Sequence, residues 1–111
     1  MKSGDIYLVD FCKAVGHEYQ GVRPAVIIQA DSYIQKTNIV TAMPLTSHLE
    51  KKWEGDILVK AGGHNRLYRD SLIRVTHIKS FDRSRFIKKI GRTDDSVMLR
   101  IKAYLKKHFG V

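Results

Sequence analysis

Pro24-Ala25-Val26-Ile27-Ile28-Gln29 is the stretch that decides the fold, and it follows a polar loop that ends in Gly21-Val22-Arg23. A short apolar run rich in β-branched residues is typical of a strand that is buried on both faces. Pro24 has no N–H to donate, so we expect it at the start of this strand. The run therefore predicts a central strand in a β-sheet.

Shorter patterns on either side predict the neighbours of this strand. Asp5 to Phe11 is apolar on both faces, which is typical of a strand with cover on two sides. Cys12 follows it and is expected to be a small, partly buried apolar residue. Further strands are predicted over residues 38–45, ending at Pro44, and over 56–61, 71–80 and 86–90, with a helical turn over 30–36.

The C-terminal segment has a different periodicity. Asp94 and Asp95 suit the start of a helix, and Gly110 suits its end. Apolar residues recur between them at helical spacing, which predicts an amphipathic helix from about residue 94 to 109 whose inner face carries Val97, Ile101, Tyr104, Leu105 and His108. The whole chain of 111 residues is thus expected to be one domain, mainly β, with a small antiparallel barrel or curled sheet and a C-terminal helix.

Charge is distributed unevenly along the chain. Lys and Arg number 20, Asp and Glu number 11, and the net charge is +9. Residues 1–55 carry no net charge, so the whole excess lies in residues 56–111. This asymmetry favours a polyanionic partner, either a nucleic acid or an acidic protein, over a basic surface that only aids solubility.

Several kinds of site are not indicated by the sequence. The five histidines form no local ligand pair, a single cysteine is present, and phosphate-binding glycine loops and serine nucleophile motifs are missing. No cofactor or metal is therefore expected. No apolar run is long enough for a membrane span, and no secretory signal pattern opens the chain. Together with the lone Cys12, this predicts a cytoplasmic protein.

Arg23 is the first candidate for chemistry. It lies where a polar loop enters a buried strand, so a fixed backbone can aim its guanidinium. A planar, permanently charged fork suits a phosphate and its transition state. Thr46 lies at the end of another predicted strand, and its hydroxyl can approach the same point if the two strands are neighbours. The alternative for Thr46 is a turn hydroxyl that bonds its own backbone.

Three ordered blocks carry a family resemblance. The first comprises Gly4-Asp5-Ile6-Tyr7-Leu8-Val9-Asp10, then Gly16-His17-Glu18, then Gly21-Val22-Arg23-Pro24-Ala25-Val26-Ile27-Ile28. The second is Pro44-Leu45-Thr46-Ser47, and the third is Arg69-Asp70-Ser71-Leu72-Ile73 with residues 78–85. In this order and spacing they resemble the PemK/MazF toxins of bacterial type II toxin–antitoxin modules.

That resemblance implies an SH3-like barrel that works as a homodimer, cuts single-stranded RNA selectively without a metal, and is inhibited by a cognate antitoxin. It implies attack by the RNA 2′-hydroxyl, which leaves 2′,3′-cyclic phosphate and 5′-hydroxyl ends. Carried over by motif, Arg23 would stabilise the phosphorane or also act as general acid or base, Thr46 would hydrogen-bond the scissile phosphate, and Glu18 would orient Arg23 or take a proton.

Substrate binding is expected to fall on loops around these residues. The family's usual glutamine after the loop glutamate is Tyr19 here, and a second usual glutamine is His77. Because unpaired RNA bases are often stacked on aromatic side chains, these changes bear on which nucleotides are bound. The substrate-binding candidates are Ser71, Tyr19, Ser47, His77 and Trp53, and Tyr68 is a further loop candidate for stacking.

Each candidate has a plainer interpretation. Glu18 could pair with a surface lysine, Ser71 could be an ordinary strand residue, and Trp53 could be a lid on the core. His17 and His48 are more simply exposed loop histidines than acids or bases. A different class of function also stays open, namely a non-enzymatic toxin of the CcdB kind that poisons gyrase, or an RNA-binding module.

Overall fold

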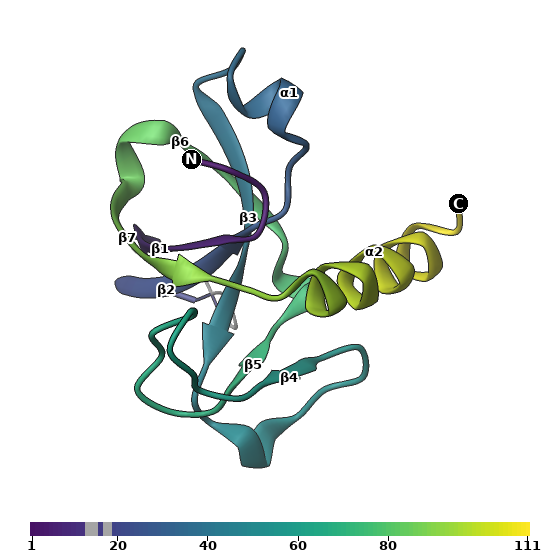
Figure 1. Ribbon diagram of the computed structural model, residues 1–111. Coiled ribbons are helices and arrows are strands. Elements are labelled where there is room, and N and C mark those ends of the chain that lie inside the picture. Colours follow the sequence, from purple (N-terminus) through teal and green to yellow (C-terminus); the bar gives the residue numbers. More distant parts are fainter. Residues whose placement is uncertain (13–15, 17–18) are drawn as a thin grey trace.

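A curled antiparallel sheet forms the body of the protein in the computed structural model, which describes residues 1–12, 16 and 19–111 (Figure 1). Seven strands lie in these residues, in the order β4-β5-β3-β2-β1-β7, with β6 paired to β3. The elements are β1 (Asp5–Asp10), β2 (Val22–Ile27), α1 (Asp31–Ile34), β3 (Ile39–Thr46), η1 (Leu49–Lys51), β4 (Ile57–Val59), β5 (Ser71–Ile73), η2 (Val75–His77), β6 (Lys79–Asp82), η3 (Arg83–Arg85), β7 (Phe86–Arg92) and α2 (Asp95–Phe109). The mainly β fold class with a C-terminal helix is confirmed.

The strand β2 holds the central place that its sequence predicts, between β1 and β3. Ala25, Val26 and Ile27 are completely buried. The strand nevertheless begins at Val22, so the prediction that Pro24 starts it was wrong. Pro24 pairs with Leu8 of β1, and the pairing with β3 begins only at Ala25. At Pro24, which has no N–H, β2 is therefore paired with β1 alone and not yet with β3.

The strand β3 does not end at Pro44, contrary to the prediction. Pro44 is buried inside the strand, opposite Ala25, and its carbonyl accepts a hydrogen bond from Arg74 N at 2.9 Å. The strand then runs on to Thr46, which pairs with Leu72 of β5. Because β3 passes from one set of partners to another, it connects both parts of the sheet.

The predicted strand over residues 71–80 is interrupted. Its two ends are β5 and β6, which both pair with β3, and the 3-10 turn η2 separates them. From the pair Leu45–Ile73 to the pair Ala42–Lys79, β3 advances three residues while its partner advances six. The three extra residues between β5 and β6 do not interrupt the alternation of apolar and polar residues in the sequence. Periodicity alone therefore could not locate the break.

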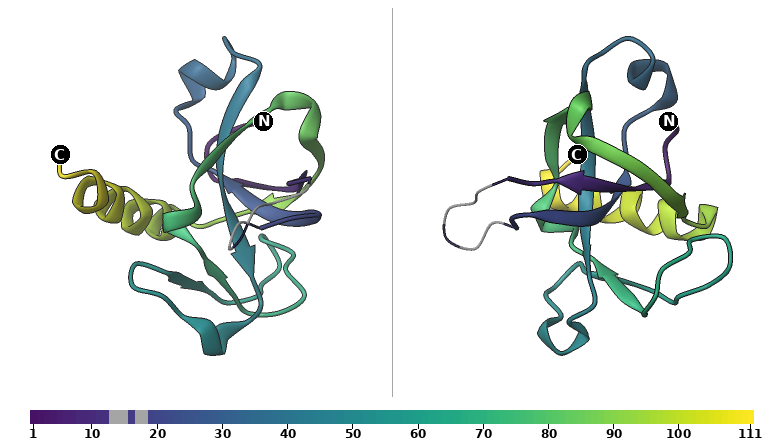
Figure 2. Two further views of the ribbon diagram at one scale, coloured as in Figure 1. Left: turned by 180° about the vertical axis from the view of Figure 1, so that it is seen from behind. Right: turned by 90° about the vertical axis from the view of Figure 1, so that its left-hand side faces the viewer.

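The helix α2 covers one face of the sheet and confirms the predicted segment. Val97, Met98 and Ile101 are buried against Ile6, Met43 and Ile73, among other residues of the main apolar cluster. Gly110 ends the helix with a positive φ of 69°. His108 is exposed, contrary to the prediction, because the last turns of α2 extend beyond the sheet (Figure 2). No helix in the described part of the chain is long and apolar enough to cross a membrane.

Cys12 departs from its predicted environment. It is exposed, with a φ of 57°, where β1 turns into the following loop. Its N–H donates to Asp10 Oδ1 at 2.8 Å, and its carbonyl accepts from Gly21 N at 3.0 Å. These bonds hold the backbone in the turn and direct the side chain away from the core, next to Arg85.

Candidate functional site

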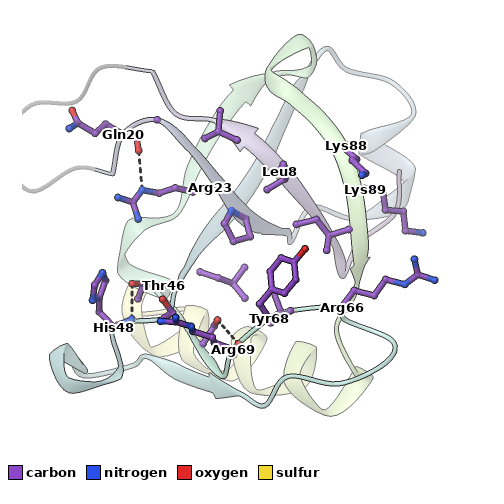
Figure 3. A pocket seen from close by; sticks show the side chains of 18 residues that line it. Leu8, Gln20, Arg23, Thr46, His48, Arg66, Tyr68, Arg69, Lys88 and Lys89 are labelled. Carbon is purple, nitrogen blue, oxygen red and sulfur yellow. Dashed lines mark hydrogen bonds between the residues drawn. The ribbon is translucent and has the colours of Figure 1, made fainter.

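Pairing between β2 and β3 brings Arg23 and Thr46 to one place. The last β2–β3 pair aligns Ala25 with Pro44, and Arg23 and Thr46 each lie two residues beyond it at the same end of the two strands. Both side chains line the same cavity (Figure 3). The condition that the two strands be neighbours is therefore met, and the guanidinium and the hydroxyl belong to one site.

Arg23 is held from two directions. Its Nε donates to the carbonyl of Gln20 at 2.9 Å, and its guanidinium carbon lies 4.8 Å from the centre of the Tyr19 ring. Neither contact uses the terminal nitrogens, which make no hydrogen bond to other described residues. The fork is thus oriented while its outer donors stay available for an anion.

Thr46 is nearly buried, with 4% of its surface exposed. Its hydroxyl oxygen accepts a hydrogen bond from His48 N at 3.2 Å. The sequence analysis gave this bond to the local backbone as the alternative role of Thr46. The bond occupies only a lone pair of the hydroxyl oxygen. The O–H donor remains for another acceptor, so the bond to the backbone does not prevent the hydroxyl from donating to a phosphate.

Two adjoining cavities share Arg23, Thr46 and His48 in their walls. The larger, the basic cavity, has a volume of about 670 Å³, and its cationic side chains are Arg23, Arg66, Arg69, Lys88 and Lys89. The smaller, the aromatic cavity, has a volume of about 180 Å³ and is lined by Tyr19, Trp53 and His77. Arg23 and Thr46 thus stand between two regions of different chemistry.

A row of three rings with a guanidinium group at each end lines the aromatic cavity; we call this row the stack, although its neighbouring rings are tilted by 50° and 41° and are not parallel. The Tyr19 and His77 rings are 5.0 Å apart, and the His77 and Trp53 rings are 4.9 Å apart. Arg23 extends the stack beyond Tyr19, and Arg74 extends it beyond Trp53 at 4.4 Å. Trp53 remains 44% exposed, so it offers a ring surface while also covering Arg74.

A buried ion pair lies beneath this stack. Arg74 Nη1 is 2.9 Å from Asp56 Oδ2, and the two side chains are 3% and 0% exposed. Asp56 Oδ2 also accepts from Trp53 N at 2.8 Å, which ties the tryptophan to the pair. The Nη1 contact is not aligned as a hydrogen bond, and Asp56 Oδ1 and Arg74 Nε have no partner among the described residues. Such a pair is costly to bury, so we read it as support for a fixed geometry.

The two predicted serines lie on the opposite side, in the wall of the basic cavity. Ser47 follows Thr46 and is exposed. Ser71 opens β5, is 6% exposed, and its hydroxyl donates to the carbonyl of Arg69 at 3.1 Å. The structure therefore places both serines beside Arg23 and Thr46, with the proton of Ser71 already engaged.

Two predicted residues, Glu18 and His17, lie outside the described residues. His48 is described: it is exposed, borders both cavities, and its Nδ1 lies 3.5 Å from Glu50 Oε1. No group of three or more His, Cys, Asp or Glu side chains that could hold a metal ion occurs in the described part of the chain.

Several residues of the site were missed from the sequence. Lys88 and Lys89 were only counted in the charge excess of residues 56–111, yet they line the same cavity as Arg23. Arg66 and Arg69 were not singled out, although they flank the exposed Tyr68. Basic residues interleaved with an aromatic one were a usable signal for nucleic-acid binding.

Comparison with known sequences points to one family. Residues 2–109 match the family described as PemK-like, MazF-like toxin of type II toxin-antitoxin system. The chain is 34% identical over 104 residues to the endoribonuclease EndoA of Bacillus subtilis, which covers 91% of this chain and 87% of that protein. It is 29% identical over 102 residues to the endoribonuclease MazF of Staphylococcus saprophyticus, covering 91% and 84%.

Solved structures give the same result for the fold. A crystal structure of MazF from Deinococcus radiodurans superposes with a TM-score of 0.82 at 25% identity, covering 100% of this chain and 97% of that one. A crystal structure of MazE-MazF from the same organism gives 0.78 at 24% identity, covering 100% and 96%. The curled sheet and its helix are thus the architecture of this group of proteins.

Proposed function

This chain belongs to the PemK-like, MazF-like family of toxins from type II toxin–antitoxin systems, and from that premise we propose that it is an endoribonuclease acting on single-stranded RNA. The observation that carries the proposal is the placement of Arg23 and Thr46 in one basic cavity, with the outer donors of Arg23 available. A guanidinium and a hydroxyl so placed suit a pentacoordinate phosphate better than they suit a metal.

The proposed reaction transfers the phosphorus from the 5′-oxygen to the 2′-oxygen of the RNA. The RNA 2′-oxygen forms a bond to the adjacent phosphorus as its proton leaves, and the bond from phosphorus to the 5′-oxygen breaks as that oxygen gains a proton. The products are a 2′,3′-cyclic phosphate and a 5′-hydroxyl. Arg23 stabilises the charge on the phosphorane and, as general acid, supplies the proton that the 5′-oxygen gains, and Thr46 donates to a phosphate oxygen. Glu18, a residue outside the described ones, orients Arg23 or takes the proton.

Selection among RNA sites falls to the residues around this pair. Tyr19, His77 and Trp53 present a row of tilted rings on one side of Arg23, and aromatic rings bind unpaired bases. Ser47 and Ser71 lie on the other side and contact the phosphate or sugar of the substrate.

The partners follow from the family. We infer that the protein works in the cytoplasm as a single-domain subunit of a homodimer, and that an acidic, partly disordered antitoxin inhibits it. The excess of positive charge in residues 56–111 supports an acidic inhibitor. Light scattering at micromolar concentration, alone and with the product of the adjacent gene, tests both associations.

The decisive test is cleavage of a long single-stranded RNA in EDTA by the wild type and by Arg23→Ala. We expect the wild type to cut and the variant to lose on the order of 10²–10³-fold in rate, because a preorganised donor to the developing charge is removed. Arg100→Ala, on α2 and outside both cavities, is the matched control and should cut normally.

Two outcomes would contradict the proposal. Cleavage that requires an added metal would reject the metal-independent mechanism. Intact RNA at every wild-type concentration, with RNA or gyrase still bound, would instead identify a non-enzymatic toxin or a binding module on the same fold.

A further inference from the structure

We propose that the loop of residues 60–70 and the strand β7 form a binding track for the sugar–phosphate backbone of RNA next to the cleavage site. In this track Arg66, Arg69 and Lys88 contact phosphates and Tyr68 stacks a base. The inference rests on the proposed function for its substrate class, but it concerns binding and can fail independently.

The charge of the basic cavity is the first observation. Five of its lining residues are Lys or Arg, and none of those described is Asp or Glu. Figure 3 shows Arg66, Lys88 and Lys89 across the cavity from Arg23 and His48. Lys89 is paired with Asp5 at 3.5 Å, which leaves Arg66, Arg69 and Lys88, besides Arg23 itself, as the cations with no ion pair to a described residue. A row of cations leading away from a phosphate site suits a polyanion that continues past that site.

Tyr68 is the second observation. Its side chain is fully exposed, at 103%, although it lies between two arginines in the cavity wall. A fully exposed ring contributes no buried surface to the fold. Base–aromatic stacking, by contrast, is a common and sequence-tolerant contact in single-stranded nucleic-acid binding.

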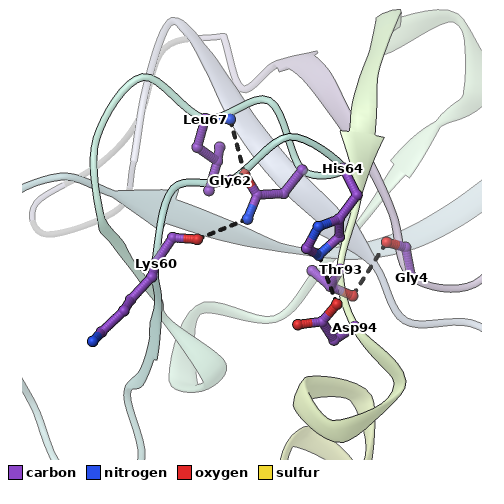
Figure 4. Close-up of polar contacts among 8 residues, drawn as sticks. Gly4, Lys60, Gly62, His64, Leu67, Thr93 and Asp94 are labelled. Atoms are coloured by element: carbon purple, nitrogen blue, oxygen red, sulfur yellow. Dashed lines mark hydrogen bonds and ion pairs between the residues drawn. The ribbon is translucent and has the colours of Figure 1, made fainter.

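The loop that carries these side chains is firmly attached (Figure 4). Asn65 is 1% exposed; its Oδ1 accepts from Gly62 N and Leu67 N at 3.0 and 3.1 Å, and its Nδ2 donates to the Lys60 carbonyl at 2.9 Å. His64 Nε2 lies 2.6 Å from Asp94 Oδ1 at the start of α2. A loop anchored from inside presents its outer side chains in fixed directions, which lowers the entropy cost of binding.

The loop also packs directly on β7. A Cβ at Gly91 would lie 2.5 Å from the carbonyl oxygen of His64 and 2.6 Å from that of Asn65, so a side chain there would displace the loop backbone. The carbonyl of His64 accepts from Arg92 N at 3.0 Å. Because of this close contact, Arg66 and Arg69 of the loop and Lys88 of β7 lie on one surface, although the two segments are distant in the sequence.

Arg66 gives the strongest indication of a function. Its φ is +54°, a conformation in which any side chain is strained and glycine is favoured. Its N–H donates to the Gly62 carbonyl at 2.9 Å, so the turn itself requires this backbone. An arginine kept where glycine would be more stable is explained if its guanidinium is needed.

The test compares two variants that each lose three charges. The track variant is Arg66→Gln, Arg69→Gln and Lys88→Gln, and the control is Arg100→Gln, Lys102→Gln and Lys106→Gln on α2. Fluorescence anisotropy measures binding of a fully 2′-O-methylated single-stranded RNA, which lacks the attacking hydroxyl. We expect the track variant to bind about 10- to 100-fold more weakly near 0.1 M salt, with a log–log salt slope shallower by about 2. The control should keep most of the wild-type affinity and slope.

Two single variants separate contact from folding. Arg66→Gly should weaken RNA binding while the melting temperature stays the same or rises, a combination that a structural role would not give. Tyr68→Ala should weaken binding about 5- to 150-fold, whereas Tyr33→Ala, equally a loss of an exposed ring on α1, should not.

The outcomes distinguish this inference from the proposed function. Wild-type cleavage with unchanged RNA affinity in the track variant would overturn the inference and leave the function standing. If the track variant loses affinity as expected but the wild type never cuts RNA, the inference stands and the proposed function is overturned. Unchanged RNA affinity with loss of the homodimer or of antitoxin binding would also overturn the inference and assign the surface to a protein contact.

Discussion

The aromatic cavity and the basic cavity share Arg23 and Thr46, but they are built on different supports. Beneath the aromatic cavity lies the Arg74–Asp56 ion pair, whose side chains are 3% and 0% exposed. Beside the basic cavity, the loop of residues 60–70 is held by the neutral amide of Asn65 and by the His64–Asp94 pair, whose side chains are 51% and 59% exposed.

This difference indicates on which side of the site residues can be substituted without unfolding the protein. A buried charge that loses its partner destabilises a protein strongly, whereas an exposed pair contributes little. Changes on the aromatic side should therefore affect stability and RNA selection together. Changes on the basic side should affect RNA affinity and leave the fold intact.

The largest effect is expected from Asp56→Ala. It leaves the Arg74 guanidinium buried without a counter-charge and removes the acceptor of the Trp53 N–H. We expect a loss of about 3–5 kcal/mol in the free energy of unfolding, and a melting temperature lower by more than about 10 °C. Thermal denaturation followed by circular dichroism measures both.

Asp94→Asn is the matched control on the basic side. It removes the charge of an exposed pair and should cost less than about 1 kcal/mol. Equal losses in the two variants would show that the two cavities are supported alike and would remove the basis of the comparison.

A smaller effect is expected from His77→Gln. The change interrupts the stack between Tyr19 and Trp53, and each such ring contact contributes about 0.5–1.5 kcal/mol beyond its buried area. We expect a melting temperature lower by a few degrees and, if bases bind the stack, a changed set of cleavage sites on a long RNA.

His108→Gln is its control, because His108 also contacts two rings but lies on α2 outside both cavities. Mapping the cut ends of one RNA with all three proteins gives the result. An identical cleavage pattern in His77→Gln and the wild type would assign the stack to structure alone.

The smallest effect is expected from Glu50→Gln in the turn η1, next to His48, which borders both cavities. A hydrogen bond to its own backbone, followed by the nearby His48, lowers the pKa of Glu50 below its ordinary value of 4.5. A carboxyl with a lowered folded pKa stabilises the protein above its unfolded pKa, and this contribution disappears as the pH falls through the folded value. The melting temperatures of variant and wild type should therefore differ slightly above pH 4.5 and converge in stronger acid. A difference that grows toward low pH would contradict this assignment.

Local hydrophobic patterns in the sequence predicted the secondary structure correctly where that structure depends mainly on the segment itself. The apolar run at Ala25–Ile27 became a central strand, and the helical spacing after Asp94 became α2 with Gly110 at its end. The same patterns misplaced the boundaries at Pro24 and Pro44, because a proline is tolerated wherever its missing N–H faces no partner. They also missed the break at η2, which depends on how β3 is shared between β5 and β6.

By itself, the sequence determined the mainly β class and the terminal helix, and it placed Arg23 and Thr46 near strand ends, because hydrophobic periodicity and strand ends are local properties of the chain. Only the tertiary structure decided that these two residues line one cavity and what surrounds them. The Arg74–Asp56 ion pair joins residues 18 positions apart, and the contact of Gly91 with the loop of residues 60–70 joins two separate segments. Neither leaves a periodic signal, since each depends on distances that exist only after the sheet has curled.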